Sequence, residues 1–328
     1  MSVFNKISLP FTPNTIEEKI LENYIEYQNL FSNFQSNFLS DLYKRYQGME
    51  TANLALYFAR QSHENILRQK DYDFNFNLSF KKFWQNHSKI EPKKHSIIKI
   101  ASEVSLPKET TRRKILQLVK QKVIGKKNGN FGWLPNEQYK ESYNSVIINE
   151  IENLSELIQF TFTKTDISIS KQELQNELQE KFSFYWFHYL NAQLEYFKIW
   201  GNQLKDLDLI LITLQITTIL ASRAKEKKLS YESIYNNPSM IKDFNDSSIS
   251  ATSISEVTNI PRATCIRKLK TLILLKMISQ DKNSKRYYLS PANISKNLIS
   301  KQITKNIVKV FSNFFFICLK TISFKTSN

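Results

Sequence analysis

The chain of 328 residues has little glycine and little proline, five and eight residues respectively. Tight turns between strands depend on these residue types, so their scarcity argues against a sheet-dominated fold and predicts a mostly helical chain. Only two cysteines occur, Cys265 and Cys318, with no Cys-x-x-Cys motif and no clustered histidines. These absences argue against a disulfide framework and a zinc site, and they fit a reducing cytoplasm.

Long hydrophobic runs and known catalytic motifs are also missing. The N-terminus lacks a charged start followed by an apolar run, so we expect no signal peptide. The longest apolar stretches, residues 207–221 and 314–319, are too short or too interrupted to span a bilayer. No Gly-x-Ser-x-Gly motif, phosphate loop or paired metal-ligand motif is present. We therefore expect a soluble, cytoplasmic, non-enzymatic protein without a cofactor or metal.

What the sequence does contain is aromatic side chains and positive charge. Aromatic residues make up 13% of a chain that is 41% hydrophobic, which is enough to bury sizeable cores. The length suits two ordinary domains. The formal net charge of +16 favours polyanionic partners.

The strongest pattern is an internal repeat. The segment IASEVSLPKETTRRKILQLVKQKVI, residues 100–124, returns as ISEVTNIPRATCIRKLKTLILLKMI, residues 254–278. An offset of 153 aligns the Ser-Glu-Val triplet at 102–104 with that at 255–257, and one residue inserted near Asn259 then shifts the offset to 154. We therefore predict two similar domains, residues 1–150 and 151–328, produced by duplication.

Each half is expected to begin with a long amphipathic helix. Aromatic and apolar residues recur every three or four positions in both, at Tyr24, Tyr27, Phe31, Phe34 and Phe38, and at Phe184, Phe187, Leu190, Leu194 and Phe197. The 153-residue offset aligns Phe31 with Phe184 and Phe34 with Phe187. Capping boxes are expected at Asn14 with Glu17 and at Ser170 with Glu173.

Further helices are expected at matching places in both halves. A second helix should cover residues 49–68 and 206–225, and a trailing helix residues 136–160 and 293–316. Tyr185, Trp186 and Trp200 could line a pocket for a small-molecule effector, but packing between the halves is the simpler expectation.

Within the repeated segment, the apolar spacing predicts two helices joined by a tight turn at residues 105–107. The second helix should bury Thr111, Ile115 and Leu118, followed by Val123, and should expose Glu109, Arg113, Leu116 and Lys120. The stretches GKKNGNFGWLP and SQDKNSKRYYLSP follow, and each has a basic polar tip between segments that can pair as a hairpin.

This order of residues resembles the winged helix-turn-helix of bacterial transcription regulators, over about 45 residues in each half. With the outer helices included, each half looks like a MarR-type subunit, in which such helices form the dimer interface. The resemblance implies a mainly α fold with small β-hairpin wings, and two tandem winged helix-turn-helix domains on a framework of long helices. One chain would then be a pseudo-dimeric monomer.

Positive charge is concentrated in the repeated segments. Residues 93–127 hold eleven Lys and Arg against two acidic residues, and residues 251–290 hold eight against two. Such side chains would neutralise phosphates, and a few would reach base edges. We expect the DNA-binding set to be Lys108, Thr110, Arg112, Arg113, Lys114, Lys126 and Lys127 in the first half, and Arg262, Thr264, Arg267, Lys268, Lys270, Lys282, Lys285 and Arg286 in the second.

Three functions remain open at this point. The first is a transcription regulator that binds double-stranded DNA with both modules. The second is a replication initiator of the plasmid type, because such proteins also pair two winged helices in one basic chain. The third is a scaffold that uses winged helices to bind protein.

Overall fold

The computed structural model describes residues 11–165, 169–228, 230, 247–289 and 298–326. The structure is 73% helix, and its described part has 13 α-helices and two small antiparallel hairpins. The expectation of a mainly helical fold with small hairpins is therefore confirmed.

The two halves contain the same main elements in the same order. The first half consists of α1 (Pro13–Glu22), α2 (Tyr24–Tyr46), α3 (Met49–Tyr72), η1 (Phe80–Lys82), α4 (Phe83–Ser88), α5 (Ile97–Glu103), α6 (Lys108–Lys120), β1 (Ile124–Lys127), β2 (Asn130–Trp133) and α7 (Glu137–Thr163). The second consists of α8 (Lys171–Glu180), α9 (Phe182–Gly201), α10 (Asp208–Glu226), α12 (Ala251–Thr258), α13 (Arg262–Leu274), β3 (Ser279–Gln280), β4 (Tyr287–Tyr288) and α15 (Leu298–Thr326). Residues 293–297 of the expected trailing helix lie outside the described residues.

One of the two expected capping boxes is in place and the other is shifted. The Ser170 hydroxyl accepts from the Glu173 N–H at 3.2 Å, and the Glu173 carboxylate accepts from the Ser170 N–H at 2.9 Å. In the first half, Thr12 and Thr15 form the box instead of Asn14 and Glu17. Helix α1 can begin as early as Pro13 because the missing N–H of proline costs no hydrogen bond in the first turn.

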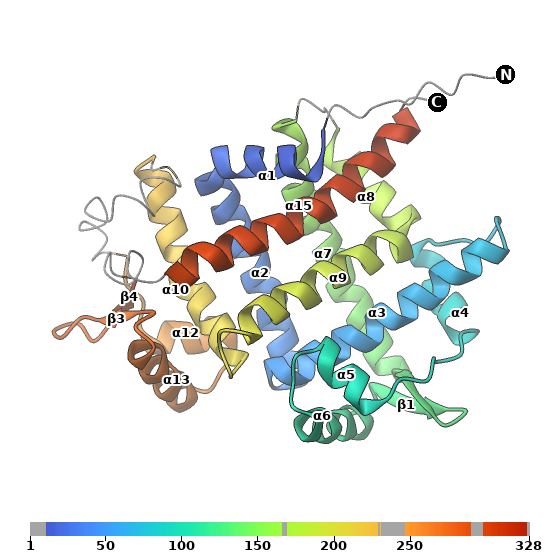
Figure 1. The fold of residues 1–328 in the computed structure, drawn as a ribbon, viewed down its shortest axis with the longest axis horizontal. Coiled ribbons are helices and arrows are strands. Elements are labelled where there is room, and N and C mark those ends of the chain that lie inside the picture. The colour runs from blue at the N-terminus through green and yellow to red at the C-terminus, as the bar shows by residue number, and fades with distance from the viewer. Residues whose placement is uncertain (1–10, 166–168, 229, 231–246, 290–297, 327–328) are drawn as a thin grey trace.

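Helices of one half pack mainly against helices of the other. Helix α2 packs against α10 and α3 against α9, while α1 packs against α15 and α7 against α8. Figure 1 shows α3 and α9 running side by side, with α15 crossing over α2. The boundary expected between residues 150 and 151 lies inside the continuous helix α7, so no linker separates the halves there.

A pair of buried glutamines marks the centre of this arrangement. Gln35 of α2 and Gln193 of α9 are 158 residues apart, and the Nε2 of each donates to the Oε1 of the other, at 3.1 and 2.8 Å. Two edge-to-face ring pairs follow the same shift of 158 residues, which takes Phe31 to Tyr189 and Phe38 to Tyr196. The ring centroids are 6.3 Å apart in the pair Phe31–Tyr196 and 5.6 Å apart in the pair Phe38–Tyr189. Equivalent positions in α2 and α9 are therefore 158 residues apart.

The 153-residue register was wrong for these leading helices. It aligned Phe184 and Phe187 with buried rings of α2, yet both are only partly buried, whereas Phe182 and Tyr185 are fully buried. The start of α9 has aromatic residues at nearly every position, so aromatic spacing alone fits several registers. Tyr185 and Trp186 are core residues, and Trp200 is partly buried. The Tyr185 hydroxyl donates to Glu177 of its own half, so the expected packing between the halves is not what holds this residue.

The buried glutamines belong to a longer polar network. Gln193 Nε2 also donates to the Tyr189 hydroxyl at 2.9 Å, and that hydroxyl donates to Glu150 Oε1 of α7 at 2.5 Å. Burial raises the pKa of Glu150 to about 8, an effect that the Tyr189 hydrogen bond reduces and Asp41 increases. Helices α2, α9 and α7 are thus joined by one chain of hydrogen bonds.

The connector between α3 and α5 also links the two halves. Phe83 of α4 is fully buried and lies between the His63 ring of α3, at a centroid distance of 4.7 Å, and the Phe182 ring of α9, at 5.3 Å. Burial, followed by the charge of His87, lowers the pKa of His63 well below its usual range. An uncharged imidazole can remain in this apolar cluster.

The last helix combines an apolar composition with burial. Residues 301–323 of α15 are long and apolar enough to cross a membrane by length and composition, and 50% of the qualifying window is buried. Phe311, Phe315 and Leu319 are fully buried, and the helix packs against α1 and α9. Part of the apolar surface of α15 is therefore covered by other helices of the protein.

Candidate nucleic-acid interface

The first basic segment forms two short helices followed by a hairpin, which together are called the first module (residues 96–133). The Ser96 hydroxyl caps α5 by accepting from the Lys99 N–H at 3.2 Å. Ser105 adopts φ 53°, which turns the chain after α5, and Pro107 is the N-cap of α6. Thr111, Ile115 and Leu118 face inward and are at most 1% exposed, as the apolar spacing predicted.

The second module (residues 250–288) repeats these local features. Ser250 caps α12 by accepting from the Ser253 N–H at 3.0 Å, Asn259 adopts φ 59°, and Pro261 is the N-cap of α13. Each of these residues follows its counterpart in the first module by 154 positions.

The inserted residue expected near Asn259 is therefore not present. The 154-residue register already holds at the caps of α5 and α12, so Thr258, which is 0% exposed, takes the inward place of Val104. Val257, which the triplet alignment had paired with Val104, is 49% exposed.

Each module ends in an antiparallel hairpin. In the first, Ile124 pairs with Trp133 and Lys127 with Asn130, and the two-residue turn Asn128-Gly129 has φ values of 52° and 77°. Positive φ at both turn positions matches the twist of the strands, and Asn-Gly supplies it readily. In the second, β3 and β4 are joined by a longer tip in which the Asp281 carboxylate accepts from the Ser284 N–H at 2.6 Å.

Most of the predicted DNA-binding side chains are exposed. Both modules lie on the same side of the molecule, along the lower part of Figure 1, with the hairpins toward the outside. The exposed residues of the set are Lys108, Arg112, Arg113, Lys126, Arg262, Arg267, Lys270, Lys282, Lys285 and Arg286, while Thr110, Thr264, Lys114 and Lys127 are partly buried. The two threonines occupy equivalent positions, two residues after the start of each helix.

Several of these cations already have partners within the protein. Arg112 forms an ion pair with Glu109 at 2.6 Å, and Lys127 forms one with Glu91 at 2.8 Å. In the second module, Arg262 donates to the Thr252 hydroxyl at 3.1 Å, and Arg286 donates to the Ser248 carbonyl oxygen at 2.6 Å. Within the described part of the chain, no hydrogen bond holds Arg113 or Arg267, so both guanidinium groups are available to a ligand.

Lys268 does not face outward. Its side chain is 7% exposed, and its Nζ contacts Asp206 at 2.5 Å and Asp208 at 3.0 Å. The expectation that Lys268 meets a phosphate therefore needs correction, because two carboxylates already neutralise the buried ammonium group. Its counterpart Lys114 is 18% exposed and lies 3.9 Å from Glu50.

The acidic partners of Lys268 also tie the two halves together. Asp208 Oδ1 accepts from the Met49 N–H, at the start of α3, at 2.9 Å. Asp208 itself lies in the first turn of α10. One carboxylate of the second half thus connects the N-terminus of α3 in the first half to Lys268 of the second module.

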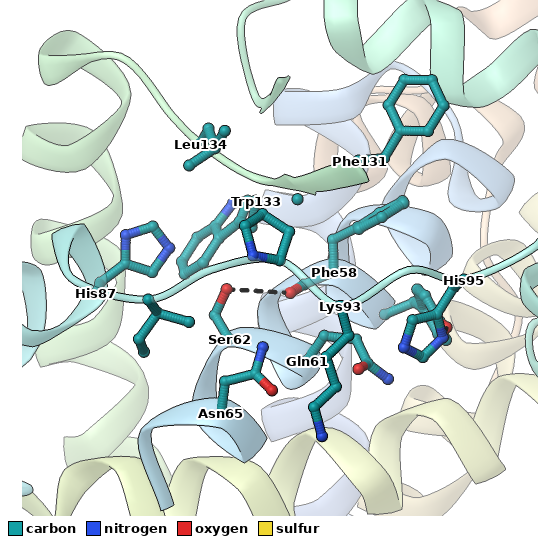
Figure 2. Close-up of a pocket in the computed structure, with 14 residues that line it drawn as sticks. Phe58, Gln61, Ser62, Asn65, His87, Lys93, His95, Phe131, Trp133 and Leu134 are labelled. Atoms are coloured by element: carbon teal, nitrogen blue, oxygen red, sulfur yellow. Dashed lines mark hydrogen bonds between the residues drawn. The ribbon is translucent and has the colours of Figure 1, made fainter. Parts of the chain in front are cut away.

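A small pocket lies beside the first hairpin, between α3, the segment after α4, and β2. Figure 2 shows Gln61, Asn65, Lys93, His95 and Trp133 among the side chains that line it. Pro92 packs so closely on Gly132 that a Cβ there would lie 2.4 Å from Pro92 Cγ. Burial lowers the pKa of His87, which also lines the pocket, to about 4. The pocket is a gap within the interface in which the first hairpin packs against α3.

The inward positions of Lys268 and Lys114 were missed because charge was considered without helix position. Lys268 lies three residues after Cys265 and four before Leu272, both of which are fully buried. This spacing puts it on the inward stripe of α13, and the spacing of Lys114 from Thr111 and Leu118 does the same on α6. Helical periodicity could therefore have assigned both lysines to the inward face.

Within the described ranges, no group of three or more His, Cys, Asp or Glu residues could hold a metal ion. Cys265 and Cys318 are both free and buried. In comparisons with protein-family models, curated proteins and solved structures, no match to this chain is found.

Proposed function

We propose that the protein is a cytoplasmic, sequence-specific transcription regulator that binds double-stranded DNA through two winged helix-turn-helix modules in one chain. The observation that carries this proposal is the paired exposure of Arg113 and Arg267 at equivalent positions of α6 and α13, each on a helix followed by a basic hairpin. In this interpretation α6 and α13 are the recognition helices and the hairpins are the wings.

The proposal includes a tandem duplication in which the halves pair as subunits of a MarR-like dimer would. Its support is the repeated order of elements, the packing of α2 and α3 against α10 and α9, and the reciprocal Gln35–Gln193 hydrogen bonds. The two modules then present their recognition helices on one side, as a single duplex requires. The proposed partner is double-stranded DNA.

In this mechanism the two recognition helices enter neighbouring major grooves, about 34 Å apart. Lysines on the helices and wings neutralise phosphates and release counterions, so affinity falls with salt. Arg113 and Arg267 have the bidentate geometry that suits guanine O6 and N7. Phosphate contacts position the protein, and base contacts select the sequence.

Fluorescence anisotropy with duplex DNA across a salt series tests the proposal. Arg113→Ala and Arg267→Ala should each weaken binding to a selected site by about 1–3 kcal/mol, with a smaller effect on random duplex. Lys19→Ala, on helix α1 at the opposite side of the molecule in Figure 1, is the control and should bind as the parent does. Binding that is insensitive to salt, or unchanged in the double arginine variant, contradicts DNA recognition by these helices.

Selection of bound fragments from genomic DNA separates regulation from replication. Sites upstream of genes support a regulator. Sites confined to short repeats at a replicon origin would replace that conclusion with a replication initiator. Retention of a protein partner by chains that bind no duplex would favour a scaffold.

A further inference from the structure

We propose that the DNA ligand is a single asymmetric duplex of two unlike half-sites, with a G·C pair read by Glu109 and Arg112 of α6 and thymine read by Ala263 and Ile266 of α13. This inference rests on the proposed function and specifies its ligand. It follows from a comparison of the exposed stripes of α6 and α13.

The two exposed stripes share one residue and differ elsewhere. On α6 the stripe consists of Glu109, Arg112, Arg113, Leu116 and Lys120, and on α13 it consists of Ala263, Ile266, Arg267, Lys270 and Leu274. When the two stripes are compared position by position, only Arg113 and Arg267 are the same residue type. Both helices begin after a proline N-cap in equivalent modules, so the differences occur on comparable surfaces.

On α6 an ion pair presents a donor and an acceptor together. Arg112 donates from Nη2 to Glu109 Oε1 at 2.6 Å and from Nε to both carboxylate oxygens at 3.1 Å. The hydrogen bond from Arg112 keeps the pKa of Glu109 below its ordinary value, so the carboxylate stays ionised. An ionised carboxylate accepts from cytosine N4, and the remaining guanidinium N–H groups can donate to guanine. The pair therefore suits a G·C base pair.

On α13 the same two positions are apolar. Ala263 is exposed and Ile266 is partly exposed, and neither side chain can form a hydrogen bond. Apolar side chains at a major-groove surface contact the thymine methyl group favourably. Against G·C they would leave polar base edges without partners, which costs free energy. The α13 surface therefore favours thymine where the α6 surface favours G·C.

The next position of the stripe increases the difference. Leu116 of α6 is 50% exposed, whereas Lys270 of α13 is an exposed cation that can contact a phosphate. The first module packs on α3 and the second module packs on α10 and α2. Because α2 packs against both α3 and α10, the two modules keep fixed places in the molecule. A bound chain should therefore have one orientation on its site.

Site selection followed by rearrangement of half-sites tests this inference. The selected site is called AB, with A bound by α6 and B by α13, and it is compared with the inverted repeats AA and BB at the same spacing. The unmodified chain should bind AB at least about ten-fold more tightly than either repeat, because each unmatched base pair costs about 1–3 kcal/mol. Hydroxyl-radical footprinting of AB with one chain per duplex should show a single orientation.

A double variant transfers one surface onto the other module. Glu109→Ala with Arg112→Ile gives α6 the two apolar residues of α13, and it should change the preferred duplex from AB to BB. The matched control, Glu22→Ala with Lys19→Ile, removes another exposed i,i+3 ion pair, on α1, and should leave the preference for AB unchanged. Circular dichroism melting checks that both variants remain folded.

The outcomes separate this inference from the proposed function. Equal affinity for AA, AB and BB overturns the asymmetric site, and so does an unchanged preference in the Glu109 and Arg112 double variant. If the unmodified chain still binds duplex DNA in a salt-dependent way, the proposed regulator function stands. Absence of salt-dependent duplex binding by the unmodified chain overturns both.

Discussion

Lys268 and Lys270 are two positions apart on α13 and have opposite environments. Lys268 is buried against Asp206 and Asp208, and Lys270 is exposed. A buried ion pair contributes little against an apolar alternative, but removal of one partner leaves an uncompensated charge. Loss of Lys268 should therefore affect the stability of the protein, and loss of Lys270 should affect DNA binding.

We expect Lys268→Met to lower the free energy of unfolding by about 2–3 kcal/mol, because the Asp208 side chain, which is 19% exposed, loses its cation. The loss is moderate because water partly screens Asp206, whose side chain is 44% exposed. Lys270→Met should change stability by less than about 0.5 kcal/mol, and it should lower the salt slope of DNA binding by about one. Urea denaturation and anisotropy measure the two effects. A Lys268→Met chain as stable as the parent would show that the pair is not structural.

Residue environments could be predicted from sequence where helix position was used. The inward residues Ile115 and Leu118 and the exposed Arg113 were placed correctly by apolar spacing. Lys268 was assigned from charge alone, and its position between Cys265 and Leu272 was overlooked. The acidic partners come from α10 and from the turn before it, and no local pattern in α13 could reveal them.

At the scale of elements, α2, α9 and α7 are joined by the polar chain from Gln35 to Glu150. The pKa of Glu150 is about 8, so between its ordinary value and pH 8 the folded protein binds a proton that the unfolded chain lacks. This contribution to stability is fully present below the ordinary pKa and is lost as the pH rises through 8, at up to about 1.4 kcal/mol per pH unit.

Glu150→Gln should remove this pH dependence, because glutamine stays neutral and its Oε1 can still accept from the Tyr189 hydroxyl. The variant should match the parent near pH 4 and be more stable than the parent at pH 9. Thermal melting from pH 4 to 9 measures the difference. Glu152→Gln, on the exposed face of the same helix, is the control, and equal pH profiles for the parent and Glu150→Gln would contradict an ionisation-coupled network.

The elements themselves were largely predictable, but their alignment was not. Turn residues and caps, such as Pro107 with Pro261, define the helix pairs locally, and Asn128-Gly129 defines the first hairpin. Helices α2 and α9 lack such markers, so their 158-residue correspondence emerged only from tertiary contacts, namely the Gln35–Gln193 pair and the two exchanged ring pairs. The absence of a linker at residue 150 is a tertiary property, because it depends on how far α7 extends against α8.

At the scale of the whole molecule, the halves bury their apolar faces against each other. Residues 11–165 expressed alone would expose the surface of α2 and α3 that α10 and α9 cover, so we expect this fragment to aggregate or remain unfolded. Co-expression with residues 166–328 should yield a soluble 1:1 complex. Size-exclusion chromatography with light scattering measures this, and a stable folded monomer of residues 11–165 would contradict the mutual dependence.

The presence of both modules in one polypeptide has a consequence for evolution and for dosage. In a homodimer each substitution appears twice, so the two contact surfaces must change together. Here Arg112 can be altered while Ile266 is retained, and each surface is free to acquire its own preference. In the proposed function one chain supplies both modules, so occupancy of its DNA site should rise with the first power of protein concentration even at a few copies per cell.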